Sequence, residues 1–275
     1  PSLPTKTDST DPSLVIKTHT TGLLGFGRIG RALSDYIEVD PAFELEQALV
    51  RSTKEGLPRE KQLTDVAALE TRPVDLCVEA ATHEVLADLG ESVLTASDLM
   101  VLSGSACAEE HVQERIEAAS EDNGTNVYLP HAALLKIDCL VDARGELQSV
   151  EIEVTKAPDH LDISYTDAVA PADVSGRTVL YDGPVRGLCR TFPRNFNSHA
   201  AVALAGLGLD ETRFTLVADP AVDVADHVIT AVGDGFDLKI VRTSDIEGVT
   251  GDYTLVSIWG SMRRVLDVDD GLKYI

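Results

Sequence analysis

Six residues near the start of the chain, from Gly25 to Gly30, follow the pattern G-x-G-x-x-G. A short apolar run precedes them, and residues at helical spacing follow as far as Pro41. In such a strand-turn-helix context, Gly25 permits the tight turn, Gly27 lets a pyrophosphate approach the backbone, and Gly30 lets the helix pack closely on the strand. The pattern predicts a dinucleotide site whose phosphates meet the helix N-terminus. Its expected contacts are Gly25, Phe26, Gly27, Arg28, Ile29 and Gly30.

The residue that contacts the adenosine ribose is expected about 20 positions after these glycines. Arg51 stands 21 positions after Gly30, with Ser52 next to it, and no acid occurs from Val50 to Lys54. An acid there would bond the 2′-hydroxyl of NAD, whereas arginine and serine suit the 2′-phosphate of NADP. We therefore expect NADP or NAD as cofactor, with NADP favoured; a solvated surface arginine is the alternative interpretation of Arg51.

The first half of the chain alternates between strand and helix patterns. Strands are expected over 21–25, 43–50, 74–81, 99–103 and 126–130, and helices over 29–37, 83–94 and 109–119. This alternation predicts an α/β fold with a doubly wound parallel sheet, the Rossmann arrangement.

The second half changes to period-two alternation, which is typical of a sheet with one exposed face. Strands are expected over 149–155, 213–218, 227–232 and 236–242, in a mainly antiparallel sheet of a C-terminal α+β domain. An amphipathic helix over 253–266 is expected to pack back on the first domain. The predicted organisation is a flexible tail (1–17), a dinucleotide-binding domain (18–131, joined by the C-terminal helix, 251–275) and a substrate domain (132–250).

Composition narrows the class of protein. The net charge of −23 disfavours nucleic acid as a partner, and 8 lysines against 15 arginines on an acidic chain suggest adaptation to concentrated salt, a halophilic trait. No apolar run reaches the length of a membrane span, and the polar start of the chain lacks the order of a signal peptide, so a cytoplasmic protein without membrane association is expected. The four cysteines form no C-x-x-C pair, so we expect reduced thiols and no metal site.

Later motifs give the chain a family resemblance. The matching segments are V-E-A-A (78–81), S-G-S-A (103–106), T-K-A-P (155–158), F-P-R-N-F-N (192–197), V-A-D-P-A-V (217–222) and T-L-V-S-I (254–258). In this order they resemble the L-aspartate dehydrogenase family over nearly the whole chain. The resemblance implies an NAD(P)-dependent oxidoreductase acting on the CH–NH2 group of a small amino acid, which converts L-aspartate to iminoaspartate, or to oxaloacetate and ammonia. It also implies a substrate/oligomerisation domain whose sheet often joins that of a second subunit, and hence a homodimer or higher homo-oligomer.

The same resemblance assigns roles to individual residues. It places the catalytic histidine at His227, where a histidine suits proton transfer near neutrality and where Asp223 and Asp226 could orient it. Without the motif, the favoured interpretation of His227 would be a histidine in an ordinary strand. The remaining six histidines have no such support. Cofactor contacts are expected at Ala80, Ala133 and Asn197, and a substrate contact at Asn195.

One stretch departs from the family. The family's glycine-rich loop S-G-A-I-G-G-L-D is H-A-A-L-L-K-I-D here, over 131–138, so side chains replace glycines beside the substrate. His131 and Lys136 become candidate substrate contacts, Lys136 either pairing a carboxylate or standing in solvent. The family's asparagine two positions before the histidine is Ala225, and Ser198 and His199 replace small residues. A different 2-amino acid as substrate (dehydrogenase or imine reductase), or a non-catalytic dinucleotide sensor, therefore remain alternatives.

Overall fold

The first half of the chain forms a parallel sheet. The computed structural model describes residues 17–134, 137–161, 174–244 and 252–269, so nearly all of the expected tail (1–17) and Lys136 lie outside the described residues. Six strands pair in parallel in the order β3-β2-β1-β4-β5-β6. Their bounds are β1 His19–Leu24, β2 Phe43–Leu49, β3 Gln62–Leu63, β4 Leu76–Glu79, β5 Asp98–Val101 and β6 Val127–Tyr128. This is the strand order of the Rossmann sheet, as predicted.

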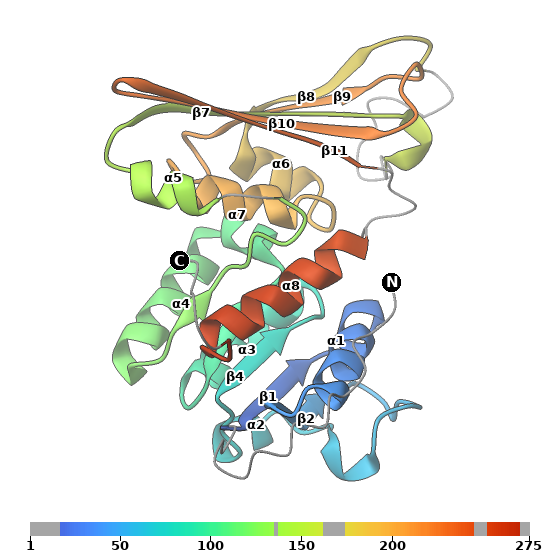
Figure 1. Ribbon diagram of the computed structural model, residues 1–275, viewed down its shortest axis with the longest axis vertical. Coiled ribbons are helices and arrows are strands. Elements are labelled where there is room, and N and C mark those ends of the chain that lie inside the picture. Colours follow the sequence, from blue (N-terminus) through green and yellow to red (C-terminus); the bar gives the residue numbers. More distant parts are fainter. Residues whose placement is uncertain (1–16, 135–136, 162–173, 245–251, 270–275) are drawn as a thin grey trace.

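Helices cover both faces of this sheet because its strands are apolar on both sides (Figure 1). Leu23 and Leu24, neighbours on β1, point to opposite faces and belong to separate buried clusters. One cluster lies under α1 (Arg28–Val39), and the other lies under α2 (Ala68–Thr71), α3 (His83–Leu94) and α4 (Glu110–Asn123). The predicted helix over 83–94 has the same bounds in the structure.

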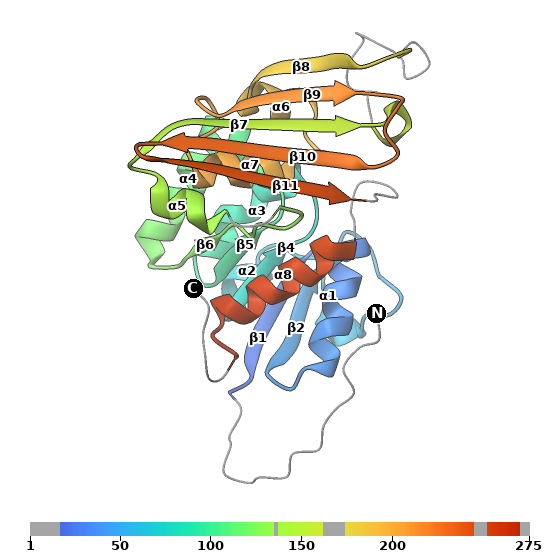
Figure 2. The ribbon, with the colours of Figure 1, turned by 45° about the horizontal axis from the view of Figure 1, so that its top comes forward.

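The last described helix, α8 (Asp252–Val265), returns to the first sheet. It runs beside α1 in Figure 2, and Ile258 and Met262 are buried in the same cluster as Leu33. Trp259 stacks on Tyr36, with ring centroids 5.5 Å apart. The chain thus leaves the first sheet, builds a second and comes back. Among the described residues, no helix is long and apolar enough to cross a membrane.

The second sheet has five strands in the order β11-β10-β7-β9-β8 and packs one face on helices (Figure 1). The strands are β7 Leu147–Lys156, β8 Thr178–Pro184, β9 Arg213–Ala218, β10 Ala225–Gly233 and β11 Phe236–Ser244; the helices are α5 Asp138–Ala143, α6 Val185–Thr191 and α7 Asn197–Ala205. Three pairings are antiparallel and β7–β9 is parallel, so the sheet is mixed but mainly antiparallel, as expected. On β7, buried Ile152 and Val154 alternate with exposed Glu151 and Glu153. The strand β8 and helices α5, α6 and α7 were not predicted.

A turn at His131–Leu134 joins the two halves and is tied to α8. The guanidinium of Arg264 donates to Nε2 of His131 at 3.3 Å, so Nδ1 carries the proton and donates to the hydroxyl of Ser257 at 3.0 Å. Burial and the nearby Arg264 lower the pKa of His131, which keeps the ring neutral. Ala132 follows in the left-handed region, with φ of +43°.

This conformation leads to a stability prediction. A non-glycine residue in the left-handed region costs about 1 kcal/mol or more. Ala132→Gly relieves that cost, whereas Ala133→Gly, the same change one residue later, relieves none. We expect the free energy of unfolding of Ala132→Gly to be about 1 kcal/mol higher than that of Ala133→Gly. Urea titrations followed by circular dichroism measure both values. Equal unfolding free energies for the two variants would contradict the assigned strain.

Candidate active site

The glycine turn follows β1 and shapes the start of α1. Gly25 has φ of +96°, and a Cβ there would lie 2.9 Å from the carbonyl oxygen of Ala80 on the neighbouring strand end. A Cβ on Gly30 would lie only 2.5 Å from the carbonyl oxygen of Gly25. Since real Cβ atoms do not approach that closely, only glycine lets α1 begin directly against β1.

Gly27 differs from its two neighbours in the motif. A Cβ built on Gly27 would meet no protein atom within 4 Å, so the turn is open where the pattern expects a pyrophosphate. Gly27 is also the N-cap of α1 and supplies no side chain to the free N–H groups of the first turn. These groups open on a cavity of about 430 Å³ lined by Gly25, Phe26, Gly27, Val50 and Ala80, among others. An anion bound there would satisfy them, which is the fit a dinucleotide requires.

The far end of this cavity, which we call the dinucleotide cavity, is basic. Arg51 and Lys54 both line it, and no Asp or Glu occurs among its described lining residues. Gln62 holds the loop by accepting from the backbone N–H of Lys54 and donating to its carbonyl, both at 2.9 Å. Ser52 is exposed and is not among the lining residues. The charge at this end suits a 2′-phosphate more than a 2′-hydroxyl.

A buried carboxylate lies next to Ala80, which lines the dinucleotide cavity. Glu79, at the end of β4, is fully buried and accepts from the backbone N–H groups of Ala81, Leu102 and Ser103 and from the hydroxyl of Ser103, at 2.8 to 3.2 Å. Burial raises the pKa of Glu79 to about 7, against the lowering effect of these donors. The side chain ties the carboxyl ends of β4 and β5 together, next to Ala80 of the dinucleotide cavity.

A second, smaller cavity of about 100 Å³ lies between the two sheets, and we call it the histidine cavity. Ile29 of α1 and Ile258 of α8 form its floor on the side of the first sheet. His227 of β10 and Asn197 of α7 line it on the other side. Because Ile29 belongs to the glycine motif itself, the histidine cavity adjoins the start of α1.

His227 is the central titratable group here. Its ring is 4 % exposed, and its Nδ1 lies 3.0 Å from Nε2 of His199 on α7. Nε2 of His227 is buried and has no hydrogen-bond partner among the described residues. Burial first, and then the charges of Lys156 and Arg242, lower the pKa of His227 to about 3. The ring is therefore neutral near pH 7 and has one nitrogen left for a ligand.

Cations surround this neutral histidine. Lys156 at the end of β7, Arg242 on β11 and the exposed Arg194 all line the histidine cavity, whose described lining includes no Asp or Glu. Burial, and then Arg242, lower the pKa of Lys156 to about 8. The guanidinium of Arg242 lies 5.7 Å from the ring centroid of Tyr253. A small ligand with one or more carboxylates matches this excess of positive charge.

Two serine side chains form hydrogen bonds on the side of the histidine cavity that Asn197 lines. Ser105, in the 3₁₀ turn Gly104–Ala108, donates its backbone N–H to Oδ1 of Asn197 at 3.2 Å. Its hydroxyl lies 2.6 Å from both that Oδ1 and the carbonyl oxygen of Pro193, so the two oxygens share its proton. With the oxygen so engaged, the amide nitrogen of Asn197 is the group left to donate to a ligand. Ser198 accepts from the backbone N–H of Ala133 at 3.2 Å, which links the turn at 131–134 to α7. Asn195 lines the same cavity.

The expected residues therefore separate into groups. One group lines the dinucleotide cavity: Gly25, Phe26, Gly27, Arg51 and Ala80. Another lines the histidine cavity: Ile29, Ala133, Asn195, Asn197 and His227. Arg28 is exposed at the first position of α1. His131 joins neither, since its ring is bound to α8 and borders a separate cleft beside β6 and α5.

Four further polar side chains of these cavities, Lys156, Ser105, Arg242 and His199, were not predicted from the sequence. Lys156 and Ser105 belong to the quoted segments T-K-A-P and S-G-S-A, so their motifs were the available signal. Arg242 pairs with His227 in register across β10 and β11, which could be found only once strand register was known. His199 has no motif signal in the sequence, and only the fold brings α7 to β10.

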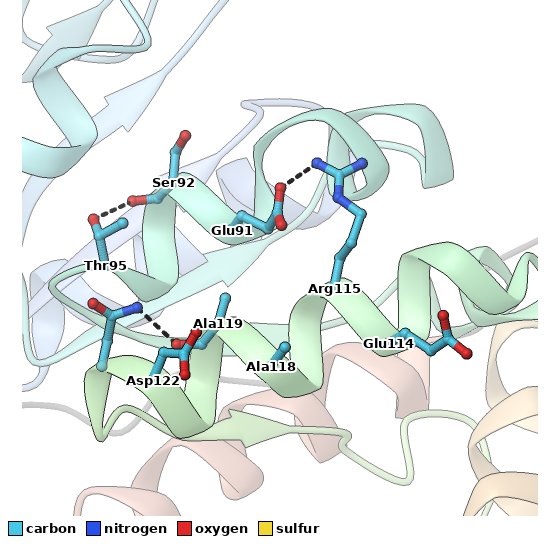
Figure 3. A pocket seen from close by; sticks show the side chains of 9 residues that line it. Glu91, Ser92, Thr95, Glu114, Arg115, Ala118, Ala119 and Asp122 are labelled. Atoms are coloured by element: carbon cyan, nitrogen blue, oxygen red, sulfur yellow. Dashed lines mark hydrogen bonds and ion pairs between the residues drawn. The ribbon is translucent and has the colours of Figure 1, made fainter.

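A third hollow carries no comparable chemistry. It is a groove between α3 and α4, and there Arg115 forms an ion pair with Glu91 (Figure 3). The hydroxyl of Thr95 donates back to the carbonyl oxygen of Ser92 at 2.8 Å. Besides this ion pair the groove is lined by the carboxylates of Glu114 and Asp122, and it shares no described lining residue with the histidine cavity.

Comparisons with known proteins agree with this geometry. Residues 25–130 match the model of the homoserine dehydrogenase NAD-binding domain, and residues 138–265 match that of the aspartate dehydrogenase C-terminal domain. A crystal structure of aspartate dehydrogenase from Thermotoga maritima superposes with a TM-score of 0.75, covering 94% of this chain and 99% of that one at 22% identity. At that identity the likeness shows the fold alone.

Sequence relatives carry the assignment further. An aspartate dehydrogenase domain-containing protein of Xenopus tropicalis is 32% identical, covering 88% of this chain and 92% of its own. An L-aspartate dehydrogenase of Brucella anthropi is 33% identical, covering 79% of this chain and 84% of its own. With the glycine turn, the histidine cavity and two sheets of the same architecture, the chain belongs to the aspartate dehydrogenase family.

Proposed function

We propose that the protein oxidises L-aspartate to iminoaspartate with NADP or NAD, the imine then hydrolysing to oxaloacetate and ammonia. The observation that carries the proposal is the histidine cavity, where a neutral histidine with a free Nε2 lies among three cations beside the glycine turn. Aspartate has one ammonium to give up a proton and two carboxylates to pair with cations. A substrate with a single carboxylate would leave part of this charge unpaired.

His227 has the proton-transfer role in this proposal. Its Nε2 takes one proton from the substrate ammonium, Cα loses a hydride, and the nitrogen is left as the iminium. A bound nicotinamide dinucleotide supplies the hydride acceptor. The carboxylates of the substrate would neutralise Lys156 and Arg242, two of the causes that lower the pKa of His227. Substrate binding would therefore raise that pKa toward the working range of a general base.

The remaining residues would hold the ligands. The helix N-terminus at Gly27 and Arg28 would bind the pyrophosphate, and Arg51 with Lys54 the 2′-phosphate of NADP. The amide of Asn197 would donate to the nicotinamide side, and Asn195 would face the substrate. We further propose that the protein is a cytoplasmic homodimer or higher homo-oligomer, because the outer face of strand β7 in the second sheet is exposed. The net charge of −23 supports the proposal that it works in concentrated salt.

Turnover is the direct test. We expect reduced nicotinamide to accumulate when the protein is mixed with L-aspartate and NADP or NAD, at low or at high salt. The variant His227→Ala should lose at least about 100-fold in kcat, since positioned proton transfer contributes roughly 10²- to 10⁴-fold. L-Glutamate and L-alanine, tested in parallel, would reveal a different 2-amino acid. No turnover of aspartate in either direction would overturn the assignment, and full activity of His227→Ala would overturn the role of the histidine.

Cofactor choice is tested at Arg51. Arg51→Ala removes a charge-assisted hydrogen bond to the 2′-phosphate, so kcat/KM with NADP should fall by about 10-fold or more while kcat/KM with NAD changes little. Arg59→Ala, on an exposed arginine that does not line the cavity, is the matched control. Equal losses with both cofactors would count against NADP recognition by Arg51.

Substrate charge is tested with succinate, a four-carbon dicarboxylate without an amine. Lys156→Met should raise the inhibition constant of succinate roughly 10- to 100-fold, because it removes a charge-assisted contact to a succinate carboxylate. Because the pKa of Lys156 is lowered to about 8, the lysine is charged below that pH and loses its proton above it. Succinate inhibition of the unaltered protein should therefore weaken above pH 8.

The pH dependence separates Lys156 from general charge effects. In Lys156→Met the inhibition constant should stay nearly constant from pH 7 to pH 9. Lys239→Met, on the exposed side of β11, serves as the control with unchanged charge in the cavity. A pH dependence that persists in Lys156→Met would show that another group binds the carboxylate.

A further inference from the structure

Two histidines from different elements form one buried unit. His199 on α7 is 3% exposed and His227 on β10 is 4% exposed. Their rings are nearly parallel, with an interplanar angle of 20° and centroids 5.1 Å apart, and Nε2 of His199 lies 3.0 Å from Nδ1 of His227. At that distance one nitrogen donates a hydrogen bond to the other.

The charged groups around His227 cannot accept a hydrogen bond from its ring, whereas His199 can. The charged side chains packed around the ring are Lys156 from β7 and Arg242 from β11, and Arg194 borders the same cavity. These are cations, which donate hydrogen bonds and cannot accept them. Ala225, two residues earlier on the same face of β10, is buried and has no polar side-chain atom. Among the described side chains, His199 is the one that hydrogen-bonds to Nδ1 of His227.

We infer that His199 is a positioning residue: it accepts the Nδ1–H of His227, and so directs the lone pair of Nε2 into the histidine cavity. This inference rests on the proposed function. When Nε2 takes the proton of the substrate ammonium, His227 has N–H groups on both nitrogens, and the inner one needs an acceptor. His199 provides that acceptor in the tautomer whose Nε2 is unprotonated and whose single proton is on Nδ1, a buried atom with no hydrogen-bond partner among the described residues.

The environment of His199 keeps it able to accept. Its ring packs edge to face with Phe196 and Phe214, with centroids 5.3 Å away in each case. Burial first, and then His227, Lys156 and Arg242, lower the pKa of His199 well below its usual value. A protonated His199 would have no free lone pair and would repel the charged form of His227. Burial against Phe196 and Phe214 therefore keeps the ring of His199 neutral while His227 accepts the proton.

Two substitutions separate positioning from packing. His199→Phe keeps a ring among Phe196 and Phe214 but has no acceptor, whereas His199→Gln can present its amide oxygen near the position of Nε2. We expect His199→Phe to lower kcat for aspartate oxidation between about 10- and 100-fold, part of the 10²- to 10⁴-fold from proton transfer, with KM within about twofold. His199→Gln should recover most of the loss.

The pH profile is the readout that a purely structural role would not move. Without an acceptor at Nδ1, protonated His227 is less stable, so the acid limb of kcat should move to lower pH in His199→Phe and return in His199→Gln. Unaltered kcat in His199→Phe, or equal losses in both variants with an unmoved acid limb, would overturn the inference.

A measurement without turnover distinguishes failure of this inference from failure of the proposed function. The ¹⁵N chemical shifts of the imidazole nitrogens of the whole protein, assigned by His227→Gln, report which nitrogen carries the proton. We expect Nδ1 of His227 to appear as a hydrogen-bonded donor in the unaltered protein and to change in His199→Phe. Unchanged shifts would overturn the pairing whether or not aspartate is the substrate.

Discussion

The arrangement of both cavities depends on one close contact, between residue 30 and the carbonyl oxygen of Gly25. Any side chain at residue 30 would place a Cβ 2.5 Å from that oxygen and push α1 away from β1. With glycine, the first turn of α1 begins against the end of β1, and its free N–H groups open beside Gly27. Ile29 belongs to this first turn and borders the histidine cavity. The same turn therefore sets both the open start of α1 at Gly27 and the floor of the histidine cavity.

Electrostatics in the second cavity follows from burial. Two imidazoles are held neutral by desolvation, while Lys156 and Arg242 add positive charge without a carboxylate among the described lining residues. Such a site is poorly paired when empty, and an anionic ligand relieves it. In the proposed reaction, binding of a dicarboxylate and the readiness of His227 to accept a proton would be coupled through the same two cations.

Local pattern predicted those parts of the structure in which burial repeats regularly along the chain. The longer strands of the first sheet are apolar on both faces, and α3 has a clear apolar side, so their positions followed from periodicity. The two-residue strand β3 and the four-residue helix α2 were not predicted, because such short segments show no periodicity. Helix α7 did not, because five consecutive residues from His199 to Ala203 are buried and no polar face marks the helix. The parallel pairing of β7 with β9 also depends on connections that a local pattern does not encode.

The sequence by itself determined the dinucleotide turn, the family and the identity of His227 as the candidate base, because each depends on a short motif with local physics or a linear order of motifs. Tertiary structure alone decided which side chains meet His227. His199 comes from a helix 28 positions away, and Arg242 faces it through strand register. The structure also turned His131 toward α8, away from the pocket that its place in the loop suggested. Contacts between distant segments depend on packing and register, which single-residue patterns do not specify.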